Sequence, residues 1–410
     1  MTLLTGAKVV TPGGVLDPGR VLVRDGLIAQ VGRGGLDLDL DLDLDLDLDL
    51  GLDPGRAESA ERAERVDLTG AWLLPGFVDL HMHGGGGHDV AASAADMAGA
   101  VAFHQAHGTT RTLVSLVTAP VARLAEQLGW VAALTAAGPG SDGQVVGAHL
   151  EGPFLAAERR GAQPAEHLRR PDRAVFADLE AAAAGALRVL TVAPELPGAA
   201  AVVAAALEAG VVAAAGHTDA TYAQAGAAFA AGITLTTHVF NGMRPLHHRE
   251  PGTAGAALDA GVACELINDG VHVHPALLRL VAAEPERLVL VTDAVDAAGA
   301  GDGEYVLGGH PVRVRDGQAR LVTGGALAGS TLTMDQAVRR AVAAGLPIEV
   351  AAAAAATNPA RVLGLDDRCG AIAPGLDADL VVLDAELAVT AVMARGRWVG
   401  GRGAPRSGGG

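Results

Sequence analysis

Cysteine and lysine are nearly absent from this sequence of 410 residues. It contains two cysteines, Cys264 and Cys369, and a single lysine, Lys8. Two isolated cysteines exclude a disulfide framework and a thiolate zinc site, so any metal ion would need histidine and carboxylate ligands. A single lysine near the start also excludes any mechanism that requires a lysine in the rest of the chain.

Long apolar runs and an excess of positive charge are missing too. No stretch of about 18 uninterrupted apolar residues occurs, and the first residues lack a basic segment followed by an apolar core. The sequence therefore predicts a cytoplasmic protein with no membrane partner. The formal net charge of −17 argues against a nucleic-acid partner, which requires a basic face. An anionic substrate would have to be held by a local cluster of hydrogen-bond donors.

The length and a hydrophobic content of 50% fit one large domain and one smaller domain. Short β-like runs lie at both ends of the chain, at residues 7–12, 20–32, 71–75, 379–384 and 389–400. Their alternation and turn residues predict strands of one small sheet. We therefore expect a small β-sandwich domain built from residues 1–71 and 372–400, and a larger domain over residues 72–371.

Two segments are expected to contribute little to these domains. Residues 35–51 alternate leucine and aspartate with period two, which is compatible with an amphipathic β-ribbon or with a disordered acidic insert. We favour the insert, over residues 36–50 of the small domain. The tail at residues 401–410 lacks apolar residues and is expected to be disordered.

Eight apolar, β-rich runs recur through the middle of the sequence. They cover residues 76–83, 110–117, 145–152, 187–195, 211–219, 233–241, 262–269 and 287–294. Most of the intervals contain alanine-rich, helix-compatible stretches, such as residues 200–210 and 275–286, so strands and helices alternate. Eight such units close into a (β/α)8 barrel of the TIM type, whose reactive residues lie at the C-terminal ends of the strands.

Six polar side chains stand at or near the ends of these runs. They are His81 and His83 in the first run, Glu151 in the third, His217 in the fifth, His238 in the sixth and Asp293 in the eighth. A barrel would bring all six to one rim. Imidazole nitrogens and a carboxylate oxygen suit Zn²⁺ or a similar divalent ion, so the set predicts a metal site.

A structural role is the alternative for each of these residues. Glu151 could cap a turn before Pro153, and Asp293 could cap the helix after the eighth strand. His217 could form a simple polar pair with Asp219. A metal site is favoured over these roles because all six residues would meet at one rim.

Such a site has a definite chemistry. A metal ion lowers the pKa of water towards neutrality and polarises a carbonyl group, so that the activated water can attack the carbonyl carbon. Asp293 would accept a proton from the water and return it to the leaving nitrogen. The expected reaction is amide hydrolysis.

At these motifs the chain resembles the amidohydrolase superfamily and, within it, the N-acetylglucosamine-6-phosphate deacetylases. The resemblance extends over nearly the whole chain and rests on PGFVDLHMHG, GAHLEGPF, AAGHTDAT, THVFNGM, REPG, NDGVHV, LVTDA and LAGSTLTM. It implies a metal-dependent enzyme of amino sugar metabolism, which releases acetate from N-acetylglucosamine 6-phosphate. It also implies Zn²⁺ as the expected cofactor.

The resemblance assigns roles to residues of this sequence. Glu151, His217 and His238 would hold the principal metal ion, and Asp293 would be the catalytic acid and base. His81 and His83 suggest a second ion, so one or two ions are expected per subunit. The positions that match substrate contacts are Ala162, Gln163, Asn241, Gly242, Arg249, His272, Leu327, Ala328 and Gly329. The arginine of this family commonly reaches the phosphate across a dimer interface, which implies a homodimer.

Several alternatives stay open. Many amidohydrolases bridge two metal ions with a carboxylated lysine, but no lysine lies within the predicted barrel, and Glu151 is its natural substitute. An N-acetylgalactosamine-6-phosphate deacetylase is a close alternative, and a deaminase-like amidohydrolase is a more distant one. A non-catalytic scaffold is disfavoured because such relatives usually lose their metal ligands.

Overall fold

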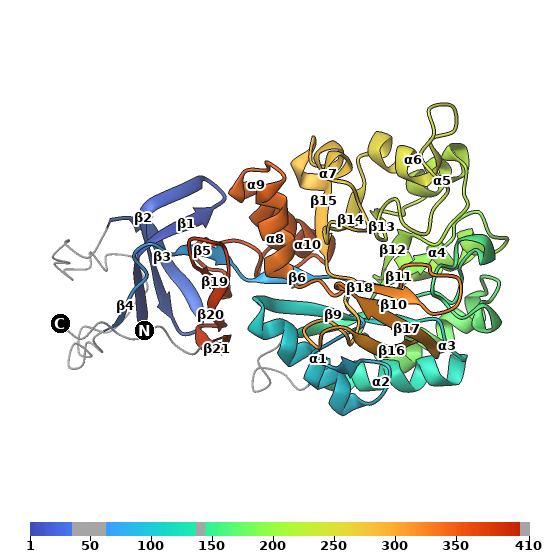
Figure 1. Cartoon of the computed structure of the whole chain (residues 1–410), viewed down its shortest axis with the longest axis horizontal. Helices are drawn as coiled ribbons and strands as arrows, with labels where there is room; N and C mark the ends of the chain where they lie inside the picture. The colour runs from blue at the N-terminus through green and yellow to red at the C-terminus, as the bar shows by residue number, and fades with distance from the viewer. Residues whose placement is uncertain (35–62, 137–143, 402–410) are drawn as a thin grey trace.

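The computed structural model describes residues 1–34, 63–136 and 144–401 of the chain. They form a parallel barrel and a separate sheet assembled from both ends of the chain. The sheet lies beside the barrel in Figure 1. The predicted insert at residues 36–50 and the predicted tail beyond residue 401 lie outside the described residues.

The predicted (β/α)8 barrel is confirmed. Its strands, in their order around the barrel, are β6 (Phe77–Asp79), β9 (Thr109–Val117), β10 (Val145–Glu151), β11 (Leu187–Val192), β12 (Val212–Ala215), β13 (Leu235–Thr236), β14 (Ala263–Ile267) and β15 (Leu288–Val291). All neighbours pair in parallel, and each strand lies within one residue of its predicted run. Every residue of β9 is buried, as expected for a strand between an inner core and outer helices.

The barrel closes just beyond the ends of β6 and β15. The backbone N–H of His83 donates to the carbonyl of Ala294, and the N–H of Asp293 donates to the carbonyl of His81, both at 2.8 Å. These bonds hold the end of the first barrel strand beside the end of the eighth. The two most distant motifs of the predicted site therefore become neighbours.

Helices cover the outside of the barrel. They are α1 (Ala94–Ala106), α2 (Val121–Ala136), α3 (Arg173–Ala183), α4 (Ala199–Glu208), α5 (Tyr222–Ala230), α6 (Gly252–Ala260), α7 (Pro275–Val281), α8 (Met334–Ala343), α9 (Ile348–Ala352), the π-helical η6 (Ala353–Thr357) and α10 (Asn358–Val362), with 3-10 turns η3 (Ala157–Arg159), η4 (Ala165–His167) and η5 (Pro285–Arg287). Each long helix buries one stripe: in α8, Val338 and Ala341 are buried while Arg340 is exposed. None of the helices in the described ranges is long and apolar enough to cross a membrane.

The separate sheet confirms the prediction that both ends of the chain pair with each other. Its strands are β1 (Thr2–Thr11), β2 (Gly14–Arg24), β3 (Leu27–Arg33), β4 (Glu64–Asp67), β5 (Trp72–Pro75), β19 (Leu380–Leu383), β20 (Val389–Ala394) and β21 (Arg397–Gly401). They form one continuous sheet around its own core, to which Ile28 of β3 and Met393 of β20 both belong. Strand β5 lies beyond the predicted boundary at residue 71, yet it pairs with β1 and β19, so the domain limits stay a prediction.

Two small sheets lie among the loops of the barrel. The first consists of β7 (Gly84–Gly85) and β8 (His88–Asp89), and the second of β16 (Gly303–Leu307), β17 (His310–Arg315) and β18 (Gln318–Leu321). The second sheet was not predicted. Its inner face, with Val312 and Val314, packs against Val117 and Val295 at the ends of barrel strands. It therefore covers part of the rim at which the predicted site lies.

Candidate active site

The six polar residues predicted from the strand ends meet at the C-terminal rim of the barrel. Glu151 is the last residue of β10, and the others follow β6, β12, β13 and β15 by two to four residues. The exposed fractions of His81, His83, Glu151, His217, His238 and Asp293 lie between 0% and 7%. Reactive side chains gather at this end in barrels of this type. The structure thus brings together groups separated by more than two hundred residues in the sequence.

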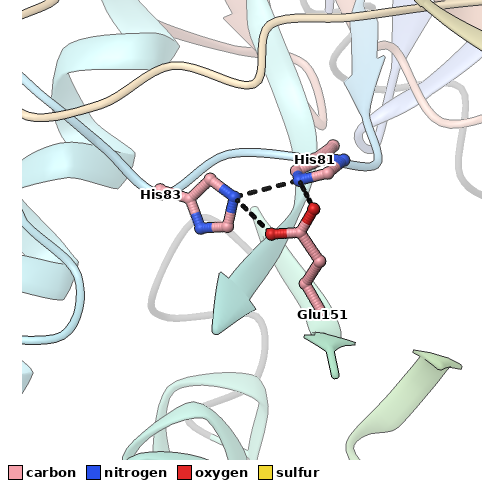
Figure 2. A group of neighbouring side chains, drawn as sticks. All are labelled: His81, His83 and Glu151. Carbon is pink, nitrogen blue, oxygen red and sulfur yellow. Dashed lines mark hydrogen bonds and ion pairs between the residues drawn. The ribbon is translucent and has the colours of Figure 1, made fainter. Parts of the chain in front are cut away.

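Glu151 lies between two pairs of histidines. Its Oε1 atom is 3.0 Å from Nε2 of His217 and 3.1 Å from Nε2 of His238. On the other side, its Oε2 atom is 3.3 Å from Nε2 of His83, and Nε2 of His81 is 3.6 Å from Oε1 (Figure 2). Each pair forms, with Glu151, a group of ligand atoms within 4.8 Å of one another. One carboxylate could therefore serve two metal ions.

The surrounding protein fixes the orientation of all four imidazole rings. Nδ1 of His81 lies 3.1 Å from a carboxylate oxygen of Glu265. The Nδ1 atoms of the other three rings contact backbone carbonyls: His83 contacts Ser115 (3.0 Å), His217 contacts Arg159 (2.8 Å) and His238 contacts Asn241 (3.2 Å). Because these partners are acceptors, each Nδ1 carries the ring proton and donates it. Every Nε2 atom is thereby turned towards Glu151.

The resulting set of donor atoms fits a divalent cation. Nε2 of His81 is 2.9 Å from Nε2 of His83, and Nε2 of His217 is 3.2 Å from Nε2 of His238. Two lone pairs at such distances repel each other unless they share a cation, either a proton or a metal ion. Each group offers two imidazole nitrogens and one carboxylate, with acceptors behind the rings, which is the arrangement of a protein metal site.

The charges in the site keep its carboxylates ionised. Burial raises the pKa of Asp293, but the charge of His81 and the hydrogen bond from His83 outweigh it and lower this pKa to about 2. Burial likewise opposes the ionisation of Glu151, yet the charge of His81 and the contact with His217 hold its pKa well below the usual range. Burial lowers the pKa of His83, whereas its bonds to Asp293 and Glu151 raise it to about 9. The ionised carboxylates therefore favour a positive charge between them, carried either by protons on the histidines or by a metal ion.

Three site residues have strained backbones. The φ angles of His217, His238 and Asp293 are 47°, 30° and 48°, in the left-handed region that residues other than glycine rarely adopt. Such a conformation costs on the order of 1–3 kcal/mol and persists where the surrounding structure enforces it. Here it turns the chain at three strand ends so that the side chains point into the site.

The structural alternatives for these residues are wrong. No helix follows Asp293 directly, because residues 294–302 are not helical and the next helix is α8. Asp219 pairs with Arg159 and Arg244 rather than with His217. The carboxylate of Glu151 contacts histidines and Gln163 and does not cap the turn that follows it.

A cavity of about 250 Å³ opens at the site. Twelve predicted site residues line it: His83, Glu151, Ala162, Gln163, His217, His238, Asn241, Gly242, His272, Asp293, Leu327 and Gly329. Further lining residues were not predicted, among them Val117 at the end of β9 and Leu307 of β16. Apolar walls with a few polar groups are typical of a small-molecule site.

Three predicted residues do not line this cavity. His81 belongs to the ligand group but is fully buried behind it. Ala328 is buried in the core beneath β16–β18. Arg249 is exposed in the loop after β13, and its backbone N–H donates to Nδ1 of His247. The position of Arg249 therefore does not support a role in the pocket of its own chain.

Two lining residues have well-defined partners. Gln163 donates from Nε2 to Oε2 of Glu151 at 2.6 Å, and its own Oε1 accepts from the backbone N–H of Thr118 at 2.8 Å. It thus orients Glu151 as well as lining the cavity. His272 donates from Nδ1 to Asp269 at 2.7 Å, which leaves Nε2 for a ligand. Burial raises the pKa of Asp269, but the bond from His272 outweighs it and keeps this pKa low.

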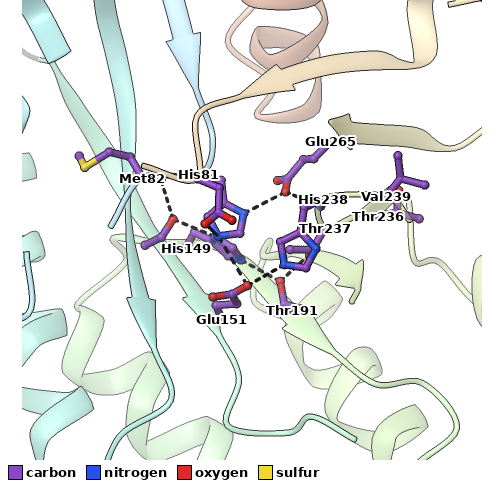
Figure 3. A network of polar contacts seen from close by, with 12 residues as sticks. His81, Met82, His149, Glu151, Thr191, Thr236, Thr237, His238, Val239 and Glu265 are labelled. Carbon is purple, nitrogen blue, oxygen red and sulfur yellow. Dashed lines mark hydrogen bonds and ion pairs between the residues drawn. The ribbon is translucent and has the colours of Figure 1, made fainter. Parts of the chain in front are cut away.

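Two buried groups next to the ligands were not predicted. Glu265 of β14 contacts His81, and His149 of β10 lies with its ring centroid 4.5 Å from that of His81 (Figure 3). Burial and the charge of His81 lower the pKa of His149 well below the usual range, and both its ring nitrogens already bond to Ser115 and Thr191. It is a neutral support rather than a ligand. A carboxylate within the apolar run at residues 263–267 was the available signal for Glu265.

The chain matches known proteins over most of its length. The model of the amidohydrolase family matches residues 72–399. The chain is 40% identical over 366 residues to the N-acetylglucosamine-6-phosphate deacetylase of Bos taurus, which covers 85% of this chain and 89% of that protein. It is 37% identical over 400 residues to the N-acetylgalactosamine-6-phosphate deacetylase of Escherichia coli O157:H7, covering 96% and 98%.

A solved structure shows the same similarity. It is that of an aspartate-to-alanine variant of N-acetyl-D-glucosamine-6-phosphate deacetylase from Mycobacterium smegmatis, in complex with N-acetyl-D-glucosamine 6-phosphate. The two chains share 42% sequence identity with a TM-score of 0.87, over 97% of this chain and 99% of the other. Fold and sequence therefore point to the same relatives.

Proposed function

The chain belongs to the amidohydrolase family, and from this premise we propose that it hydrolyses the acetamide group of N-acetylglucosamine 6-phosphate, giving glucosamine 6-phosphate and acetate. The observation that carries the proposal is that the two candidate metal-ligand groups around Glu151 lie with Asp293 at one cavity, which has the apolar walls and few polar groups of a small-molecule site. The similarity to deacetylases of this substrate over nearly the whole chain supports it.

Glu151, His217 and His238 would hold a divalent ion, with Zn²⁺ as the first candidate, and His81, His83 and Glu151 would hold a second one. Both ligand sets are buried and have their rings oriented by the protein. When bound, such an ion polarises an amide carbonyl and lowers the pKa of water towards neutrality.

Asp293 moves the proton. Its low pKa leaves the carboxylate ionised at neutral pH, so it can accept the proton of the attacking water. The same group then donates that proton to the nitrogen of the departing amine. Since Oδ1 of Asp293 lies 3.3 Å from Nε2 of His83, the base stands beside the metal ligands where the water must be activated.

The sugar phosphate is held by donors on the cavity wall and by one arginine from outside. His272, Asn241 and Gly242 line the cavity, and His272 has Nε2 available for a ligand. Arg249 lies outside the cavity of its own chain, which suits a residue that acts in the pocket of a second subunit. The proposed active form is therefore a homodimer. The cytoplasmic location stays a prediction from the sequence.

The galactosamine epimer is the second candidate substrate. The Escherichia coli relative named for that substrate matches more of this chain than the bovine glucosamine relative does. Acetate release should therefore be measured with both N-acetylhexosamine 6-phosphates and with unphosphorylated N-acetylglucosamine as the control, before and after metal removal and Zn²⁺ addition. Preferential turnover of N-acetylglucosamine 6-phosphate by the metal-loaded protein is expected. Release of ammonia in place of acetate would indicate a deaminase instead.

A further inference from the structure

Glu265 is a buried carboxylate that no step of the proposed reaction uses. It lies in β14, is 0% exposed, and its carboxylate points towards the ring of His81 (Figure 3). Its Oε2 atom is 3.1 Å from Nδ1 of His81, while its Oε1 atom has no hydrogen-bond partner among the described residues. Burying a carboxylate costs free energy unless its charge is paired or hydrogen-bonded. Here the contact with His81 is directed at a metal ligand.

The partner of His81 differs in kind from those of the other ligand histidines. His83, His217 and His238 each donate from Nδ1 to a neutral backbone carbonyl, whereas His81 donates to a carboxylate. A hydrogen bond to a charged acceptor is roughly twice as strong as one between neutral groups. It also makes the opposite ring nitrogen more basic and hence a better metal ligand.

Glu265 also contacts the other ligand group, but only through the backbone. The N–H of His238 donates to the same Oε2 atom at 3.2 Å. This bond supports the strained turn at His238, where φ is 30°. It does not touch the His238 ring, so the ligand strength of that imidazole depends on Asn241 and not on Glu265.

We propose that Glu265 is a positioning residue that selectively strengthens metal binding by the group His81, His83 and Glu151. Its carboxylate fixes the proton of His81 on Nδ1 and directs Nε2 to the ion. The group formed by Glu151, His217 and His238 is not strengthened in this way. The inference rests on the proposed metal-dependent function, and it adds a difference in affinity between the two ion positions.

The first test needs no variant. In the ¹⁵N-labelled, Zn²⁺-loaded protein, long-range proton–nitrogen NMR correlations should show the His81 proton on Nδ1, in a strong downfield hydrogen bond. The His81 signal is assigned as the one lost in His81→Gln. A His81 ring with its proton on Nε2 would overturn the proposal.

The second test measures affinity. Zn²⁺ is titrated into the metal-free protein against a coloured chelator, and Glu265→Gln is compared with the wild type. The weaker hydrogen bond of a neutral amide should reduce the affinity of one of two ions by about 10- to 100-fold and leave the other unchanged. Glu195→Gln is the matched control, because Glu195 accepts from Thr218 and Asp219 and touches no ligand ring. It should change neither affinity.

A double-mutant cycle identifies the affected ion. The variant His83→Gln lacks one ligand of the group that Glu265 is proposed to support, so Glu265→Gln should have no additional effect in that background. If Glu265→Gln lowers the affinity for both ions equally, or lowers it by the same factor with and without His83, the role of Glu265 is purely structural and the proposal is overturned. These readouts involve no substrate. A failure to deacetylate amino sugar phosphates would therefore contradict the proposed function and not this inference.

Discussion

Glu151 is the residue on which both ligand groups depend. Its Oε1 atom lies near His217, His238 and His81, its Oε2 atom lies near His83, and Gln163 holds the carboxylate in place. A carboxylate placed in this way could balance the charge of two cations without a carboxylated lysine. The sequence has no lysine after Lys8 to supply one.

The change Glu151→Gln should therefore remove metal and activity together. A neutral amide offers one oxygen instead of two and no charge, while its size and shape are nearly those of glutamate. Metal content by mass spectrometry and acetate release are the measurements. Glu158→Gln, at an exposed glutamate of η3, should leave both as in the wild type. Full metal occupancy and turnover in Glu151→Gln would contradict the assignment.

Asp293→Asn should impair the chemical step and leave metal binding largely intact. Asparagine has the shape of aspartate but cannot accept and return a proton, so kcat should fall by roughly 10²–10⁴-fold. Metal content and melting temperature should stay close to those of the wild type. Wild-type turnover in a metal-loaded variant would remove Asp293 from the mechanism.

At the scale of single elements, the sequence predicts the barrel strands better than their surroundings. β10 and the second half of β9, residues 113–117, are buried runs with few polar residues, so their burial is visible in the residues themselves. The sheet of β16–β18 escaped prediction because β17 reads HPVRVR, in which every second residue is exposed. Its other face is buried only because it packs on Val117 and Val295, which a local pattern does not contain.

The same limit applies to helix α1. His104 of this helix is fully buried, and its Nε2 donates to the carbonyl of Gly84 at 2.9 Å. The two-residue strand β7 that contains Gly84 is too short to be predicted from a pattern. Likewise, the six strand-end residues could be found from the sequence. The carboxylate of Glu265 stands out within its apolar run, but its role could not be predicted, because that role depends on a ring from a distant strand.

His104 should make the protein sensitive to acid. Burial lowers its pKa to about 4, and its Nδ1 atom has no hydrogen-bond partner among the described residues, so the protonated ring is poorly accommodated. The unfolded chain takes up this proton near pH 6.5, whereas the folded protein resists it until about pH 4. Stability should therefore fall as the pH drops through this window, by at most ~3 kcal/mol for this residue.

The comparison of wild type with His104→Gln isolates this contribution. Glutamine can donate to Gly84 but does not titrate, so its free energy of unfolding should fall less between pH 7 and pH 4. Urea unfolding at several pH values measures the difference. The half-exposed His167 provides the control, since His167→Gln should retain the wild-type pH dependence. Parallel curves for wild type and His104→Gln would contradict the prediction.

At the scale of the whole molecule, one buried arginine joins the barrel to the separate sheet. Arg111 of β9 contacts Asp377 at 2.8 Å and Asp379 at 2.7 Å, just before β19. Burial raises the pKa of Asp379, and the charge of Arg111 opposes this effect. A buried ion pair of this kind holds two parts of a chain in one arrangement, because removing either partner leaves an uncompensated charge.

The position of Arg249 leads to a prediction about the assembled molecule. The residue is exposed and outside the cavity of its own chain, although a dianionic substrate needs a strong donor in a protein with a net charge of −17. If Arg249 acts in the pocket of a second subunit, Arg249→Ala should lose a charge-assisted hydrogen bond to phosphate. A loss of about 1.5–3 kcal/mol corresponds to a roughly 10- to 100-fold decrease in kcat/KM for the phosphorylated sugar. The unphosphorylated sugar should be affected little.

Mixing two impaired variants decides which subunit supplies the arginine. A mixed dimer of Arg249→Ala and Asp293→Asn contains one pocket with an intact Asp293, and the Arg249 of that pocket comes from the other chain. Random exchange of subunits should then restore roughly a quarter of the wild-type activity, because half of the dimers are mixed and each has one complete pocket. An Arg249 that acts within its own chain gives no such pocket, and activity would stay at the sum of the two variants. Each variant mixed with itself is the control for exchange without complementation.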